Sequence, residues 1–202
     1  IKCGGYKDRP SHADNLHIDI WYKGENILPD AGSYKYNTDA ETMRYFSGTQ
    51  SHNTVMLDDN DQMLKGGRFI WYYWSQGMGA TLKEEDRSFV FTGAVRVFGH
   101  LKRNVIHQRT VTKQRGQPVW QVKDEIMGAP KGLKLKQLWH LLPGGGNMVS
   151  VTTKNEKGTQ LKALEQDGWY SSLYGQKEKT RELVFSDDSL VVETLIKIDA
   201  GA

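Results

Sequence analysis

The sequence predicts an all-β protein, a large antiparallel β-sandwich of a dozen or more strands with almost no helix. Apolar and polar residues alternate with a period of two in most segments, which is typical of strands with one buried face. Turn clusters rich in Gly, Asn and Asp separate these segments, and the chain holds 21 Gly but only 5 Pro, as tight hairpins require. No strand–helix alternation is visible, which argues against a parallel sheet.

The expected elements follow from this pattern. A helical turn is expected at 38–46, where Thr38 or Asp39 is available as the N-cap. Because composition stays uniform, we expect one domain over residues 1–202, with 126–132 as the only soft internal boundary. The expected strands are 16–21, 26–28, 53–57, 103–113, 118–126, 133–141 and 189–198.

Charge and composition exclude several classes of protein. The 27 basic and 24 acidic residues leave a net charge of +3, too little for the clustered basic face of a nucleic-acid binder. The longest apolar run, 69–74, is far shorter than the roughly 20 residues of a membrane-spanning helix. Cys3 is the only cysteine, so a metal site would need His and carboxylate ligands.

Three polar side chains stand at expected strand ends. His12 precedes the first strand, Asp30 follows the strand 26–28, and His52 opens the strand 53–57. If those ends converge, two imidazoles and one carboxylate form a competent zinc set. The pattern alone favours the alternative of three separate, hydrogen-bonded or solvated groups.

Other histidines have simpler interpretations. His17, Asp19 and Trp21 share one face of the strand 16–21, which we expect to be a polar outer face; the alternative is a face covered by another domain. His140 follows Trp139 near a strand end and is expected to be a structural histidine.

An aromatic segment, GGRFIWYYWSQG at 66–77, is the strongest candidate for sugar stacking. Alternation would place Phe69, Trp71 and Tyr73 on one face and Ile70, Tyr72 and Trp74 on the other. We expect at least one set to be core, while the other lines a groove. Basic residues are not interleaved, which argues against a nucleic-acid stacking platform.

The order of motifs resembles the C-terminal β-sandwich region of heparinase II/III-like proteins. SHADNLHIDIWYKGENILPDAGSYKY (11–36) and RYFSGTQSHNTVMLDDNDQ (44–62) carry the resemblance most specifically. IHQRTV, VWQVKDEIMG, LKQLWHLLPG and GWYSSLYGQKE follow in the same order. The resemblance covers almost the whole chain.

This resemblance implies a polysaccharide lyase that cleaves uronic-acid polymers by β-elimination. It implies an acidic polysaccharide as substrate, a periplasmic or secreted location, and a cleft between this domain and an N-terminal helical toroid. The chain has no room for that toroid, so we expect an excised domain that is inactive alone. The alternatives are a non-catalytic carbohydrate-binding sandwich that uses residues 69–74, or a domain that assists a partner chain.

The resemblance also implies roles for individual residues. It makes His12, Asp30 and His52 the ligands of Zn²⁺. Several relatives carry a catalytic His two residues before the first ligand, where this chain has Pro10, which cannot transfer a proton. The further roles given with the resemblance are catalytic for Tyr45 and Tyr36, and substrate-binding for Arg9 and Asn53. The aromatic segment itself adds Arg68 as a partner for an acidic group, and Trp71 and Trp74 as sugar-stacking residues.

Overall fold

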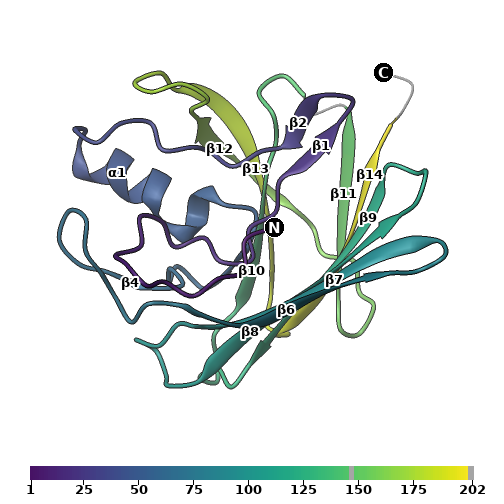
Figure 1. Ribbon diagram of the computed structural model, residues 1–202, viewed down its shortest axis with the longest axis horizontal. Coiled ribbons are helices and arrows are strands. Elements are labelled where there is room, and N and C mark those ends of the chain that lie inside the picture. The colour runs from purple at the N-terminus through teal and green to yellow at the C-terminus, as the bar shows by residue number, and fades with distance from the viewer. Residues whose placement is uncertain (146–147, 200–202) are drawn as a thin grey trace.

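Two antiparallel sheets form the body of the protein in a computed structural model that describes residues 1–145 and 148–199 (Figure 1). The last residues of the expected domain, 200–202, therefore lie outside the described part. The larger sheet has the order β11 (Val149–Asn155), β14 (Val191–Ile198), β9 (Val119–Met127), β8 (Val105–Gln114), β7 (Ser88–Val97) and β6 (Gln76–Glu84). The smaller has the order β12 (Leu164–Tyr170), β13 (Glu178–Asp187), β10 (Leu135–His140) and β3 (Val55–Leu57).

The core lies between these sheets and confirms the all-β sandwich. Trp120 and Ile196 from the six-stranded sheet pack with Trp139 and Phe185 from the four-stranded sheet. Alternate residues of β9 are buried, as the period-two pattern predicts. The segment 128–134 carries the chain from one sheet to the other, so the expected soft boundary coincides with a crossover inside one shared core.

Two short hairpins and a helix complete the fold. The hairpins are β1 (Ile20–Tyr22) with β2 (Glu25–Leu28), and β4 (Leu64–Lys65) with β5 (Trp71–Tyr72). Helix α1 (Ala40–Ser47) lies on the side of the four-stranded sheet away from the six-stranded one (Figure 1), and a short 3-10 turn, η1 (Thr49–Ser51), follows. Asp39 is the N-cap and accepts a hydrogen bond from the Thr42 amide at 2.8 Å.

The first expected strand is shorter than predicted. Leu16 adopts a left-handed backbone (φ 59°), and β1 begins only at Ile20. This turn breaks the alternation, so His17 is buried while Asp19 and Trp21 are exposed. The prediction that His17 shares a polar outer face was therefore wrong.

The aromatic segment also departs from simple alternation. Tyr73 has a positive φ of 56°, and β5 covers only Trp71 and Tyr72. Trp71 is the buried member, while Phe69, Ile70, Tyr72, Tyr73 and Trp74 are each at least 37% exposed. The expected core set of three aromatic residues does not form.

Strand β6 is an edge of the six-stranded sheet and pairs only with β7 along its ladder. Its register shifts between Gly77 and Gly79, and the Gly77 amide donates a hydrogen bond to the Gly4 carbonyl at 3.0 Å. Among the described residues, no helix combines the length and apolar character needed to cross a bilayer.

Candidate functional site

The ends of β2 and η1 bring a carboxylate and an imidazole into contact. His52 is fully buried at the end of η1, and its Nδ1 lies 2.7 Å from Oδ2 of Asp30, just beyond β2. The other carboxylate oxygen of Asp30 accepts a hydrogen bond from the Gly32 amide at 2.7 Å. Both side chains are thereby held in fixed orientations.

Two groups of candidate metal ligands share His52. One contains His12, Asp14 and His52, and the other contains His17, Asp30 and His52; within each group the donor atoms lie within 4.8 Å of one another. The His12 and His52 ring centroids are 5.3 Å apart. The three residues expected as ligands are thus neighbours, although His12 and Asp30 fall in different groups.

Sequence reasoning did not propose Asp14 or His17 as metal ligands. Asp14 follows His12 by two residues, a spacing that was available as a signal. His17 was hidden by the period-two pattern, because the turn at Leu16 reverses the direction expected for its side chain.

The residues fit a zinc ion on chemical grounds. Within the described part of the chain, Nε2 of His52 and Nε2 of His17 are buried without a hydrogen-bond partner. Buried polar atoms normally have partners, and imidazole nitrogens beside carboxylates are ligands that zinc accepts. The arrangement can therefore hold a cation.

Burial and neighbouring charges shift the protonation of these groups. Burial, together with the positive charge of His52, lowers the pKa of His12 to about 4. Burial would lower the pKa of His52, but the charge and hydrogen bond of Asp30 outweigh it and raise that pKa. Burial also opposes ionisation of Asp30, yet His52 and His17 hold its pKa below the ordinary value. An ionised carboxylate thus faces the imidazoles of His17 and His52.

Asn53 connects this site to the sandwich. Its side-chain amide donates to the carbonyls of Ile18, Leu28 and Pro29 at 3.0, 2.9 and 3.2 Å. Its Oδ1 accepts from the backbone N–H of His140 at 2.7 Å. Because Asn53 is fully buried, direct substrate contact conflicts with the structure, and its role is to hold the loop.

A buried ionic cluster supports the backbone of the same loop. Arg109 donates to the Asn53 carbonyl at 2.6 Å and to the Leu16 carbonyl at 2.7 Å. It also forms a bidentate pair with Asp124, at 2.7 and 2.9 Å. Nε2 of His107 and Nε2 of Gln137 lie 2.7 and 2.8 Å from the same carboxylate. Burial would raise the pKa of Asp124, but these cationic and hydrogen-bonding partners hold it below the ordinary value.

Tyr45 points into the four-stranded sheet. Its hydroxyl donates to Glu182 and accepts from the Trp169 amide at 2.9 Å. Burial and the charge of Glu182 raise the pKa of Tyr45, which disfavours a phenolate there. His140 is buried beside them, with Nε2 3.2 Å from Glu182, in keeping with the expected structural role.

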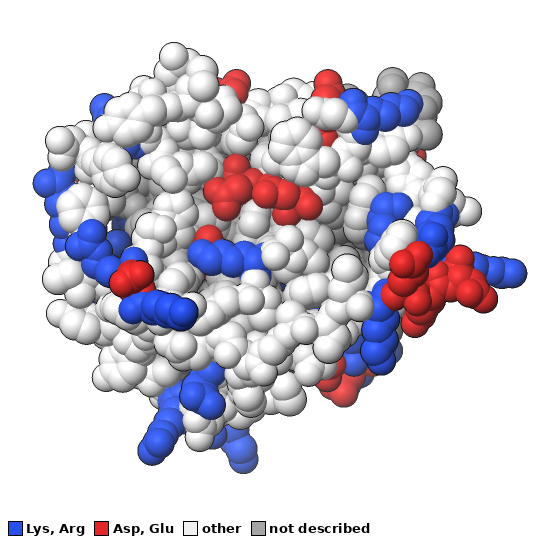
Figure 2. Space-filling view, in the orientation of Figure 1, with Lys and Arg blue, Asp and Glu red and all other residues white. Residues whose placement is uncertain are grey.

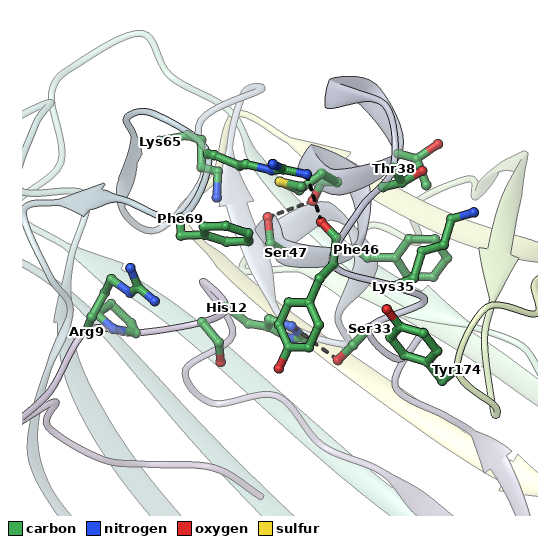
Figure 3. Close-up of a pocket in the computed structure, with 16 residues that line it drawn as sticks. Arg9, His12, Ser33, Lys35, Thr38, Phe46, Ser47, Lys65, Phe69 and Tyr174 are labelled. Atoms are coloured by element: carbon green, nitrogen blue, oxygen red, sulfur yellow. Dashed lines mark hydrogen bonds between the residues drawn. The ribbon is translucent and has the colours of Figure 1, made fainter.

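A basic pocket of about 430 Å³ opens next to His12 (Figure 3). Arg9, Lys35, Lys65 and Arg68 line it, and no Asp or Glu is among its described lining residues. Arg9 and Lys65 lie on one side and Lys35 and Tyr174 on the other, with His12 and Ser33 between them (Figure 3). On the face shown in Figure 2, Lys and Arg form separate groups instead of one continuous basic surface, so the cationic character is local.

Only some of the residues expected to contact substrate line the basic pocket. Arg9, Arg68 and Tyr36 line the basic pocket. Trp71 is buried and donates from Nε1 to the Ser11 carbonyl at 3.2 Å, which conflicts with a stacking role. Trp74 is partly exposed but does not line the pocket. Sequence reasoning missed Ser33, Lys35, Lys65 and Tyr174, which come from segments that meet only in the fold.

Comparison with known proteins gives the context of this site. The family model described as Heparinase II/III-like, C-terminal matches residues 1–196. A heparin-sulfate lyase of Bacteroides stercoris is 25% identical over 205 residues, which cover 92% of this chain and 28% of that protein. A heparin-sulfate lyase of Pedobacter heparinus is 25% identical over 180 residues, covering 85% of this chain and 26% of that protein.

Solved structures share the fold. A heparinase III structure superposes with a TM-score of 0.77 at 20% identity, covering 98% of this chain and 32% of that chain. The heparan sulfate lyase HepC of Pedobacter heparinus gives a TM-score of 0.74 at 20% identity, covering 94% of this chain and 31% of that one. The chain therefore spans less than a third of the length of these relatives.

Proposed function

The chain belongs to the heparinase II/III-like C-terminal family, and on that premise we propose that it forms the β-sandwich wall of a polysaccharide lyase. The substrate class is an acidic, uronic-acid-containing polymer of the heparan sulfate kind, by analogy with the heparin-sulfate lyases it resembles. A helical domain outside this chain would supply the opposite wall. We extend the proposal to a periplasmic or secreted location, where such a polymer is encountered; cell fractionation tests it.

The observation that carries the proposal is the basic pocket beside His12. Four cationic side chains and no described carboxylate converge on one cavity, together with Tyr36, Phe69 and Tyr174. Cations attract the carboxylate and sulfate groups of an acidic sugar, and aromatic rings pack against sugar faces. Lys65 is partly buried at the pocket, and this burial lowers the pKa of its amine.

In β-elimination, a base removes the C5 proton of the uronate while negative charge develops on its carboxylate. The C4–C5 double bond then forms as the C4–O bond breaks, and an acid protonates the leaving oxygen. Arg9, Lys65 and Arg68 are suited to stabilise the developing charge, an effect that counts most at transition states. Tyr36, which is 72% exposed at the pocket, is a better candidate for proton transfer than Tyr45, whose hydroxyl is held by Glu182.

The metal centre would hold the rim of this pocket together. We propose His12, Asp30 and His52 as the zinc ligands, supported by their proximity and by the buried, unpartnered Nε2 of His52 within the described residues. Bound zinc would pin the loops that carry them. Metal analysis after dialysis should find about one equivalent of zinc per chain, as expected for one such site.

The decisive experiment measures binding of a heparan sulfate oligosaccharide by calorimetry. The double substitution Lys65→Ala and Arg68→Ala should weaken binding by about 100-fold or more, since hydrogen bonds to charged groups contribute roughly 1.5–3 kcal/mol each. Lys83→Ala, an exposed cation on β6, is the matched control and should change nothing. Equal binding of a neutral oligosaccharide, or an unaffected double variant, would contradict the proposal.

A lyase assay tests whether cleavage requires the helical domain that would form the opposite wall of the cleft. The chain alone should produce no absorbance from the C4–C5 double bond, whereas a longer protein that includes a helical domain should. Efficient cleavage by the chain alone would refute this dependence.

A second candidate function is a non-catalytic carbohydrate-binding sandwich. It is favoured by the exposed rings of Tyr72, Tyr73 and Trp74, which lie outside the basic pocket. Loss of oligosaccharide binding in Trp74→Ala, with full binding retained in the Lys65→Ala and Arg68→Ala variant, would select this alternative.

A further inference from the structure

The basic pocket has a second cavity as its neighbour. This second cavity has a volume of about 660 Å³, and His100 and Asn60 line it but not the basic pocket. Both cavities are lined by Thr38, Met43, Lys65 and Arg68. Because both volumes lie in the range of ordinary ligand sites, roughly 300–1,000 Å³, the shared residues act as a partition within one longer groove.

This partition includes the tip of the β4–β5 hairpin, residues 66–70. The two strands form a sheet of their own with only two residue pairs. The tip closes on itself through a hydrogen bond from the Gly66 amide to the Ile70 carbonyl at 2.8 Å. Residues 67–70 are exposed, so little packing holds the tip against the rest of the molecule.

One side chain ties the tip to the loop on the other side of the basic pocket. Nη2 of Arg68 donates to Oδ1 of Asn37 at 2.7 Å and to the Tyr36 carbonyl at 3.3 Å. Within the described part of the chain, these are the only hydrogen bonds from residues 66–70 to another segment. Phe69 of the same tip (Figure 3) adds an edge contact with the Tyr36 ring, at 6.4 Å between centroids. Arg68 therefore closes the partition between the two cavities.

The nitrogen that Arg68 uses for this contact is the one that an acidic group needs. A carboxylate or sulfate binds a guanidinium most strongly through two parallel N–H bonds from neighbouring nitrogens. One of these hydrogens comes from Nη2, whether its neighbour in the pair is Nη1 or Nε. Since Nη2 already donates to Asn37 and Tyr36, a paired contact with an acidic group displaces at least one of these acceptors.

We propose that the Arg68–Asn37 hydrogen bond is a latch that divides one saccharide groove into two compartments, and that an acidic group of the polymer opens it by drawing Arg68 away from Asn37. The released hairpin tip then joins the second cavity to the basic pocket, and further sugar units of the same polymer occupy it. The identity of the ligand rests on the proposed function, whereas the latch does not. Asn37 is not among the described lining residues of either cavity, so its substitution changes the latch and leaves the lining side chains in place.

The first test is amide hydrogen exchange of the purified chain without ligand. Asn37→Ala should accelerate exchange of the Gly66 and Ile70 amides about 2- to 10-fold, the factor expected for the loss of one hydrogen bond that holds the tip. Asn37→Asp, which turns the contact into an ion pair, should slow this exchange. The amides of β9 are the internal reference. Equal exchange at the tip in all three proteins would refute the latch.

The second test is calorimetry with a heparan sulfate disaccharide and an octasaccharide. Asn37→Ala should bind the octasaccharide about 2- to 10-fold more tightly, because no latch has to be broken. Ala40→Trp fills part of the second cavity from an exposed position on α1, and should remove most of the advantage of the octasaccharide over the disaccharide. Ala80→Trp, at an exposed position on β6, is the matched control and should keep that advantage. Circular dichroism verifies that each variant is folded.

The outcomes separate this inference from the proposed function. If Ala40→Trp keeps the full advantage of the octasaccharide, or if Asn37→Ala binds it no better, the inference is wrong although the basic pocket stands. If the unmodified chain binds neither saccharide, the proposed function fails, and the exchange measurement still decides whether Arg68 holds the hairpin.

Discussion

Replacing Arg109 by Met is the substitution that we expect to damage the sandwich most. Arg109 is fully buried on β8 and pairs with Asp124 on β9, which is also fully buried. It also donates to the Leu16 and Asn53 carbonyls, at 2.7 and 2.6 Å. Met fills much of the same volume but satisfies none of these acceptors.

The expected loss follows from these contacts. Removing one partner of a buried ion pair costs about 3–5 kcal/mol, and each unsatisfied buried carbonyl adds about 1–3 kcal/mol. A loss of at least about 5 kcal/mol is comparable with the whole stability of many domains, about 5–15 kcal/mol. Arg109→Met should therefore be largely unfolded, or unfold at very low urea concentration.

The assay is urea unfolding followed by the fluorescence of the core residues Trp120 and Trp139. The double variant Arg109→Met with Asp124→Leu should be more stable than Arg109→Met alone, since it removes the uncompensated carboxylate. Arg115→Met is the control, because this half-exposed arginine pairs with Glu84 at the surface. A loss below about 1 kcal/mol for Arg109→Met would refute the reasoning, because a buried pair left without its cation costs several times more.

Three further predictions address the same polar network. The pKa of Asp124 is lower in the folded state than in the unfolded state. Its contribution to stability is therefore complete above the unfolded Asp pKa of about 3.9 and is lost as pH falls toward the folded value. Asp124→Asn should reduce the fall in urea midpoint below about pH 4, and a pH profile equal to that of the unmodified chain would contradict this. Gly168→Ala places a Cβ in steric conflict with Oε1 of Glu182 and should cost about 1–3 kcal/mol in urea unfolding. Gly67→Ala, with nothing within 4 Å of the added Cβ, should be as stable as the unmodified chain. Equal stabilities of the two variants would contradict the steric conflict. Tyr45→Phe removes the hydroxyl that donates to Glu182 and should lower the free energy of unfolding by about 1–3 kcal/mol. The zinc stoichiometry of this variant should be unchanged. Loss of zinc would show that Tyr45 supports the metal centre directly.

Half of the strands in the two sheets could be predicted because their signal is local, whereas β6, β7, β11, β12 and β13 were not among the expected strands. The alternation at 118–126 and 189–198 matches β9 and β14 within two residues at each end, and Asp39 caps the helix where a capping residue was expected. In these segments the buried face repeats every second residue, so sequence order and burial agree.

The site was harder to predict because it depends on backbone reversals and on segments distant in sequence. A single left-handed residue, Leu16, turns His17 inward, and Tyr73 interrupts the aromatic segment in the same way. Lys35 and Lys65 reach one pocket from different loops, a meeting that no local pattern records. Convergence near His52 was anticipated only because strand ends gather at a rim.

The edge strand β6 bears on the tendency of the protein to self-associate in concentrated solution. An edge strand presents unpaired backbone N–H and C=O groups with which another chain can form hydrogen bonds. Here the Gly4 carbonyl pairs with the edge of β6 at Gly77. The register shift between Gly77 and Gly79 also disrupts the regular backbone geometry with which a further strand would pair. Beyond it, Lys83 and Glu84 introduce charge beside the exposed Leu82. The segment around Gly4 thus covers part of this edge, and we expect its removal to favour self-association through the exposed backbone groups of β6.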